Sequence, residues 1–135
     1  MAGGDQHSLI LLSDGTLKAT GANSSSQLGD TTTTQRTSPV AVSALTGVVA
    51  IAVGGSHNLA RTSANTVWSW GGNLSGQLGL GDTTNRSAPV AISGVSGITK
   101  IGAGDRHSLA VTSTGIVHAW GENGTQQLGD GTTVD

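Results

Sequence analysis

Cysteine, phenylalanine and tyrosine are absent from this 135-residue sequence, which holds only two prolines and one methionine. Without cysteine the chain can form no disulfide and has no thiol for catalysis or metal binding. Only 10% of the residues are charged and the formal net charge is −2, with the six Lys and Arg residues scattered along the chain. Because nucleic-acid binding depends on a clustered basic surface, we expect no nucleic-acid partner.

Long apolar runs are missing as well. No stretch approaches the roughly 20 apolar residues that span a bilayer, so we expect no membrane partner, and no signal peptide is visible. Hydrophobic residues make up 35% of the chain, below the roughly 45–50% of typical globular domains. Such a deficit is also a property of disordered chains, but the regular spacing of Val, Ile, Leu and Trp favours a folded domain.

The sequence does contain 22 glycines and a unit that occurs three times. His7, His57 and His107 mark equivalent positions, because 57 − 7 and 107 − 57 both equal 50. The same step relates two further sets of residues: Gly21, Gly71 and Gly121, then Leu28, Leu78 and Leu128. A fixed period indicates one supersecondary unit, repeated because a single copy cannot bury its apolar face. We divide the chain into units 2–51, 52–101 and 102–135 of a single repeat domain, 1–135.

Each complete unit contains four short segments that are typical of strands. In the first unit these lie at 7–12, at 16–20, from Pro39 onward and at 48–53. Proline is tolerated at the first residue of a strand or at a sheet edge, so Pro39 and its counterpart Pro89 are expected to open the outermost strand. No stretch has the 3.6-residue apolar period of a helix. This pattern predicts an all-β fold of β-propeller blades, each a four-stranded antiparallel meander, in an incomplete propeller.

The recurring residues are expected to hold the blades together. Trp70 and Trp120 end the second strand of their units, where large side chains fill the gap between neighbouring blades, and Thr20 holds this place in the first unit. The recurring Leu of each unit is expected to pin a long polar loop to the core. The recurring His is expected to hydrogen-bond a neighbouring backbone group or hydroxyl.

These histidines are poor candidates for a metal or catalytic site. Equivalent positions on successive blades lie around an axis and face different neighbours, whereas zinc needs ligands that converge within roughly 2.0–2.3 Å of one point. Ser8 and Ser108 each follow a His, and adjacent strand residues point to opposite faces, which argues against a Ser-His-Asp triad. We therefore expect no catalytic residue, no metal and no cofactor.

One position varies from unit to unit, as Lys18, Trp68 and His118. Because structural positions in these units keep their residue type, this variation indicates either a less constrained strand start or a surface that binds a partner. Trp68 is the strongest anchor candidate, since Trp is enriched at interface hot spots. The alternative, that Trp68 packs between blades, stays open.

The motif in these units resembles that of a known family. It reads (Ile/Val)-x-x-Gly-x-x-His-Ser-Leu, then a hairpin, then Val-x-x-Trp-Gly-x-Asn-x-x-x-Gln-Leu-Gly. The third unit carries it at Ile101, Gly104, His107, Ser108, Leu109, Val117, Trp120, Gly121, Asn123, Gln127, Leu128 and Gly129. This pattern resembles the regulator of chromosome condensation repeat, with departures at Asn58 in the middle unit and at Thr20 in the first.

The resemblance implies a propeller that acts as a protein-binding platform. A closed propeller has about 4–8 blades, so we expect either a segment of a longer repeat protein or copies of the chain that assemble side by side. The low-charge texture, rich in Thr, Ser and Gly, resembles bacterial or phage-borne members. That resemblance favours an extracellular, cell-surface or virion-associated location over the cytoplasm.

The predicted function is a protein-interaction or assembly module, and its partner is an unidentified protein or further copies of the chain. Two alternatives from the same family stay open. One is a guanine-nucleotide exchange factor that regulates a small GTPase, and the other is a secreted binding propeller of the enzyme-inhibitor type.

Overall fold

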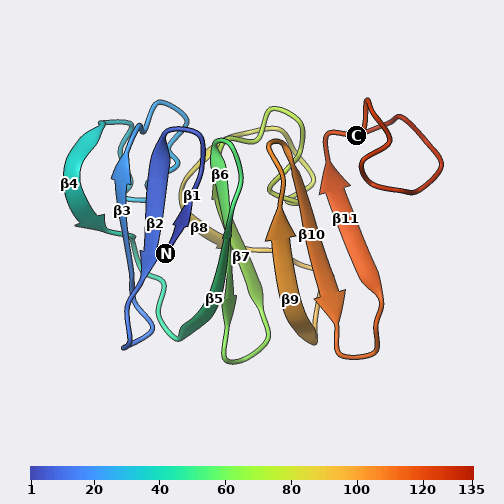
Figure 1. Cartoon of the computed structure of the whole chain (residues 1–135), viewed down its shortest axis with the longest axis horizontal. Coiled ribbons are helices and arrows are strands. Elements are labelled where there is room, and N and C mark those ends of the chain that lie inside the picture. The colour runs from blue at the N-terminus through green and yellow to red at the C-terminus, as the bar shows by residue number, and fades with distance from the viewer.

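Three antiparallel sheets stand side by side in a computed structural model that describes all residues from 1 to 135 (Figure 1). The first sheet contains β1 (Ala2–Gly3), β2 (His7–Leu11), β3 (Leu17–Gly21) and β4 (Arg36–Ala41). The second contains β5 (Val48–Val53), β6 (His57–Thr62), β7 (Val67–Gly71) and β8 (Arg86–Ala91). The third contains β9 (Ile98–Ala103), β10 (His107–Thr112) and β11 (Val117–Gly121). The predicted all-β meanders are confirmed, and no helix long and apolar enough to cross a membrane is present.

The sheets do not follow the repeat frame chosen from the sequence. The segment Val48–Val53 has the predicted bounds, but it pairs with the strand that follows it, β6, and not with the strand that precedes it. The predicted unit boundaries after residues 51 and 101 therefore fall inside β5 and β9. A repeat sequence defines a period but no starting point, and only the strand pairing sets where each sheet begins.

The prediction that proline opens the outermost strand is half right. β4 and β8 do lie at the outer edge of their sheets, but they begin at Arg36 and Arg86, three residues before the proline. The pairing of β3 with β4 shifts register between Ala19 and Gly21. Pro39 lies in this irregular stretch, where no ladder hydrogen bond is required of its missing N–H.

Two apolar clusters fill the spaces between the sheets. We call the contact between the first and second sheets the first seam, in which Leu9 and Leu17 pack with Trp70. The second seam lies between the second and third sheets and buries Leu59 and Ile98. Because adjacent residues of a strand point to opposite faces, the middle sheet contributes to both seams. This stacking of sheets face to face is the arrangement of propeller blades.

The first strand of each sheet lies closest to its counterparts. β5 lies beside both β1 and β9, and backbone hydrogen bonds link the segments that follow these strands, from Asp5 N to Gly55 O at 3.2 Å and from Gly55 N to Asp105 O at 3.0 Å. There is no room for side chains here, since a Cβ added at Gly54 would lie 2.5 Å from the Gly104 carbonyl oxygen. The glycines that follow β5 and β9 thus occupy the crowded inner side of the stack.

Candidate functional site

The recurring histidines reach across the seams. His7 and His57 begin the second strand of their sheets, and their side chains are buried. The Nε2 atom of His7 lies 2.9 Å from Asn58 Oδ1 in the next sheet, and His57 Nε2 lies 2.9 Å from Ser108 Oγ. His107 has no following sheet and makes no such bond. At the second seam the partner is a hydroxyl, which is one of the two kinds predicted. At the first seam it is a side-chain amide, which the sequence did not predict.

A backbone carbonyl completes each of these contacts. In the first seam the Gln27 carbonyl oxygen accepts from Asn58 Nδ2 at 2.7 Å and from Trp70 Nε1 at 3.2 Å. The second seam repeats the arrangement with Gln77, Ser108 and Trp120, at 2.8 Å and 2.9 Å. Sequence reasoning missed the function of this carbonyl, although the Gln-Leu-Gly triplets recur at the fixed step.

These contacts determine which ring nitrogen carries the proton. Asn58 Oδ1 can only accept, so His7 Nε2 donates to it. Ser108 donates its hydroxyl hydrogen to Gln77 and therefore accepts from His57 Nε2. In both histidines Nδ1 is the unprotonated nitrogen, and it is buried without a partner. Each seam thus contains one neutral histidine in a defined tautomer.

Burial keeps both histidines neutral. Several causes together lower the pKa of His57 to about 4. Removal from water is the largest, electrostatic interactions with His7 and His107 act in the same direction, and Asp105 acts in the opposite direction. Burial also lowers the pKa of His7, against the opposing hydrogen bond to Asn58. The two side chains therefore serve as uncharged hydrogen-bond donors at neutral pH.

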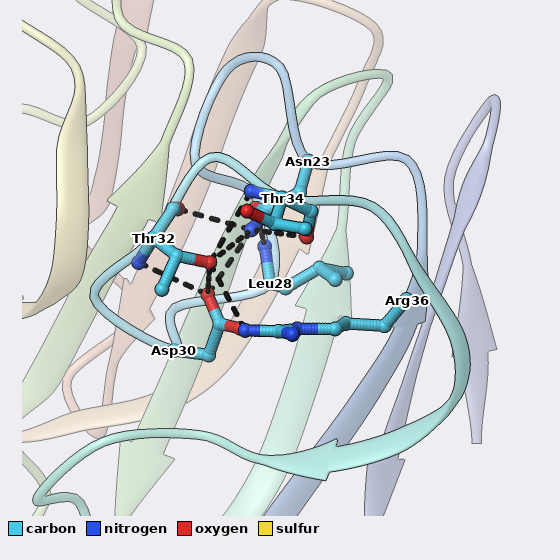
Figure 2. Close-up of polar contacts among 6 residues, drawn as sticks. All are labelled: Asn23, Leu28, Asp30, Thr32, Thr34 and Arg36. Carbon is cyan, nitrogen blue, oxygen red and sulfur yellow. Dashed lines mark hydrogen bonds and ion pairs between the residues drawn. The ribbon is translucent and has the colours of Figure 1, made fainter.

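A polar cluster in each long loop positions the Gln carbonyl and the recurring Leu. Figure 2 shows it for the first unit, where the Nδ2 atom of Asn23 lies 3.0 Å from Asp30 Oδ1, 3.0 Å from Thr32 O and 3.1 Å from Thr34 O. The Oδ1 atom of Asn23 accepts from the Leu28 backbone N–H at 2.9 Å. The loop is thereby folded around one buried amide, and the Leu28 side chain reaches the core with no exposed surface.

An ion pair closes this cluster. Arg36 Nε donates to Asp30 Oδ2 at 2.8 Å. Partial burial raises the pKa of Asp30, but hydrogen bonds from Thr32, Arg36 and Asn23 outweigh it and hold the pKa below its ordinary value. The other two units centre equivalent clusters on the residues Asn73 and Asn123. Leu78 is fully buried, whereas Leu128 is only half-buried and belongs to neither apolar cluster.

The third strand of each sheet ends in a recurring glycine, which the backbone conformation at that position requires. Gly21, Gly71 and Gly121 have φ values of 111°, 101° and 101°. A Cβ at Gly71 would also lie 2.6 Å from the Ser56 carbonyl oxygen. Other residues rarely adopt this conformation, so the position marks the turn from strand into loop in every unit.

The three variable positions are not brought together. Lys18 is exposed on the first sheet, away from the second. Trp68 is half-buried and packs against the apolar cluster of the first seam. It therefore lies between blades, which is the alternative that the sequence leaves open. His118 is half-buried and lines a pocket at the edge of the third sheet.

This pocket has a volume of about 660 Å³ and lies along β11, which has no strand on its outer side. Its lining includes Ile92, Val95, His118, Trp120, Leu128 and Asp130. No group of three or more His, Cys, Asp or Glu side chains converges anywhere in the chain to hold a metal ion. The site of greatest interest is therefore the uncovered third sheet, with its face and its edge.

Family models identify the repeat. A model described as "Regulator of chromosome condensation (RCC1) repeat" matches residues 65–111, and a second with the same description matches residues 1–27, 48–77 and 98–127. The chain belongs to the RCC1 repeat family. Its first two seams show how an RCC1 repeat contacts the next one, through the His, Trp and Gln carbonyl of each pair of units.

Solved structures share this fold. Yeast RCC1 (Prp20) bound to Kap60 is similar with a TM-score of 0.89 at 24% identity, over 98% of this chain and 34% of that chain. Prp20p from Saccharomyces cerevisiae, in a structure reported with its binding to Gsp1p and histones, has a TM-score of 0.88 at 25% identity, over 98% and 35%. Human WBSCR16 has a TM-score of 0.77 at 27% identity, over 97% and 36%.

The chain spans about a third of the length of these solved relatives. A comparison with curated protein sequences finds no match. The fold of three stacked blades is thus that of an incomplete RCC1-type propeller.

Proposed function

We propose that this chain is a protein-interaction or assembly module built from RCC1-type blades, as a segment of a larger repeat protein or as one copy in an assembly, and that the face of its third sheet packs against a further blade or another protein surface. One observation carries the proposal. Val117 is 62% exposed, whereas its counterparts Leu17 and Val67 are 2% and 0% exposed because following strands and sheets cover them. Leu109 is likewise half-exposed, although its counterparts Leu9 and Leu59 are fully buried. An uncovered apolar face of this kind marks an interaction surface.

Two polar groups would add specificity to this face. His107 Nε2 and the Gln127 carbonyl oxygen hold the places of the His and Gln groups that bind the next sheet at both internal seams, and neither has a partner here. A bound surface would complete the same set of hydrogen bonds if it carried a Trp N–H together with either a Ser hydroxyl or an Asn amide. Polar groups fix orientation at interfaces.

The relatives support a binding function. The yeast RCC1 structure contains the protein Kap60, and the other Prp20p structure is reported with binding to Gsp1p and histones. His7 and His57 are held by hydrogen bonds inside the seams, which supports a structural and not a catalytic role for them. No specific observation on this chain favours the exchange-factor or the inhibitor alternative over a general binding module.

A second copy of the chain is the simplest partner to test, by the solution mass from light scattering over a range of concentrations. Ser8 of a second copy would stand where Ser108 stands at the second seam, but Thr20 would stand in place of Trp120. We expect weak, concentration-dependent association that Leu109→Asp abolishes and Thr20→Trp strengthens. A matched control is Thr33→Asp, at an exposed loop position of the first unit. A mass that stays monomeric for the parent chain and for Thr20→Trp at every concentration would overturn docking between copies on this face.

A further inference from the structure

A small polar pocket lies where the three units meet, next to the loop that follows β7. Its volume is about 200 Å³. The second unit contributes Gly72, Gln77 and Asn85 to its walls, the first unit contributes Ser25, and the third contributes Arg106. Pockets for drug-sized ligands usually measure about 300–1,000 Å³, so this one has room for a single side chain or a small anion.

The two amide side chains of this pocket offer donors. Gln77 is 3% exposed, and its Oε1 atom accepts from the Ser75 backbone N–H at 2.9 Å. This bond fixes the orientation of the amide and leaves Nε2 without a partner in the chain. Asn85 is oriented in the same way, because its Oδ1 atom accepts from the Asn73 N–H at 2.9 Å. The acceptor of each amide is thus used, and its NH2 group is free to bind a ligand.

One cation joins these donors. The Arg106 guanidinium donates no hydrogen bond within the chain, and its two nearest carboxylates, those of Asp105 and Glu122, both lie 3.9 Å away. Its side chain is 57% exposed, so it can turn toward a ligand in the pocket. The hydroxyl groups of Ser25 and Ser56 in the pocket walls are also without partners in the chain. A positive charge together with N–H and O–H donors suits an anion with several acceptor oxygens.

The third unit shows which anion fits beside such an amide. Glu122 holds the place of Gly72, and Gln127 holds the place of Gln77. The Oε2 atom of Glu122 lies 3.5 Å from Gln127 Nε2, and its Oε1 atom lies 3.9 Å from Arg106 Nη1. The second unit has the same amide but no carboxylate beside it, because Gly72 has no side chain.

We propose that the pocket beside Gly72 binds a carboxylate, supplied by an Asp or Glu side chain of a partner protein. The carboxylate lies between Gln77 Nε2 and Arg106. Leu74 lines the same pocket and is 83% exposed, so a polypeptide also gains by burying this apolar side chain, whereas a free small carboxylate gains less. This inference goes beyond the proposed function, because the site lies on the loop of the second unit and not on the face of the third sheet.

The test uses the full 135-residue chain, labelled with 15N, and NMR titration at pH 7 with an acetylated and amidated Leu-Glu-Leu tripeptide. We expect saturable shifts of the Gln77 side-chain NH2 and Arg106 Nε–H signals. The Leu-Gln-Leu tripeptide has nearly the same shape and no charge, and it should bind about 5–10-fold more weakly, since hydrogen bonds to charged groups are the stronger ones. Acetate tests a free carboxylate. The Leu74→Ser chain should bind the tripeptide more weakly and acetate as the parent chain does.

Variants of the chain test each donor. Gln77→Glu keeps an acceptor for the Ser75 N–H but replaces the free NH2 group by a charged oxygen, so it should abolish binding. Gln27→Glu is the matched control, because Gln27 makes the same bond to the Ser25 N–H at 2.9 Å and does not line the pocket; it should keep binding. Arg106→Gln should weaken binding about 2–5-fold, the range for an exposed ion pair.

Three results would overturn the site: no saturable shift of the Gln77 amide, equal binding of the two tripeptides, or shifts confined to another part of the chain. Acetate that binds as tightly as Leu-Glu-Leu would overturn a protein as the source of the carboxylate. The ligand comparison leaves the protein unchanged, so a variant that misfolds cannot hide the outcome. The Leu109→Asp chain should bind the tripeptide as the parent chain does while it loses face-to-face association, so the two proposals fail separately.

Discussion

Acid should weaken the fold through His57 in a pH range where no carboxyl group contributes. The folded-state pKa of His57 is about 4, because burial disfavours its charged form, and the ordinary value in an unfolded chain is about 6.5. Between these values the unfolded chain binds a proton that the folded chain excludes. Stability is therefore fully present above about pH 6.5 and is lost as the pH falls toward 4.

The two pKa values give the size of the effect. At pH 5 the linkage relation yields a loss of about 2 kcal/mol of unfolding free energy relative to pH 7. His7 acts in the same direction, since burial lowers its pKa too. Four carboxyl groups also have a lowered pKa, those of Asp14, Asp30, Asp82 and Asp130. Their contribution to the unfolding free energy is lost only as the pH falls below about 4. The two windows are therefore separate.

Urea unfolding followed by tryptophan fluorescence at pH 7, 6 and 5 measures this loss. The His57→Gln chain should be less stable at pH 7, since it loses the bond to Ser108, but should depend less on pH. His118 lies at the half-buried edge of the third sheet, so His118→Gln is the matched control and should keep the full dependence. An unfolding free energy that stays constant from pH 7 to pH 5 in the parent chain would refute a buried, neutral His57.

Two further predictions concern the packing of the seams. Trp70→Ala should lower the unfolding free energy by about 3–5 kcal/mol, the usual cost of emptying a large buried site. Trp120→Ala should cost clearly less, because Trp70 has no exposed surface and Trp120 is half-buried. Equal losses in urea unfolding would contradict this. Gly54→Ala should destabilise by about 1–3 kcal/mol, because its Cβ would lie 2.2 Å from His57 Cε1 and 2.5 Å from the Gly104 carbonyl oxygen. Gly124→Ala, with nothing within 4 Å of its Cβ, should change thermal unfolding little, and a similar shift for both would disprove the close approach.

The strands and the general place of the large side chains could be predicted because they depend on local pattern. The fixed step of fifty residues and the apolar alternation around His57 locate β5, β6 and β7 to within one residue. The start of β8 could not be found in this way. Edge strands have one side exposed, so Arg86, Ser87 and Ala88 lack the apolar alternation that marks a strand.

The seam contacts could not be predicted because they join residues far apart and use a group that every residue has. His7 and Asn58 are separated by 51 positions, and Gln27 takes part through its backbone carbonyl. No residue type signals a carbonyl, so the recurring Gln-Leu-Gly triplet does not reveal this contact. The departure from Ser to Asn at position 58 is visible in the sequence, but only the structure shows that Asn58 and Ser108 bridge the same pair of groups, a His ring and a Gln carbonyl.

The two ends of the stack are complementary in hydrogen bonding but not in volume. The third sheet presents His107 and the Gln127 carbonyl, and the first sheet presents Ser8, which matches Ser108 at the second seam. Thr20, however, replaces the Trp that fills each internal seam. A head-to-tail contact between copies would therefore keep the polar set and lack one large buried side chain, worth about 3–5 kcal/mol where it is present. Heterologous contacts of this kind extend into open chains of copies unless the ring closes. Because a second copy lacks the Trp that fills the internal seams, a different partner is favoured on the third sheet.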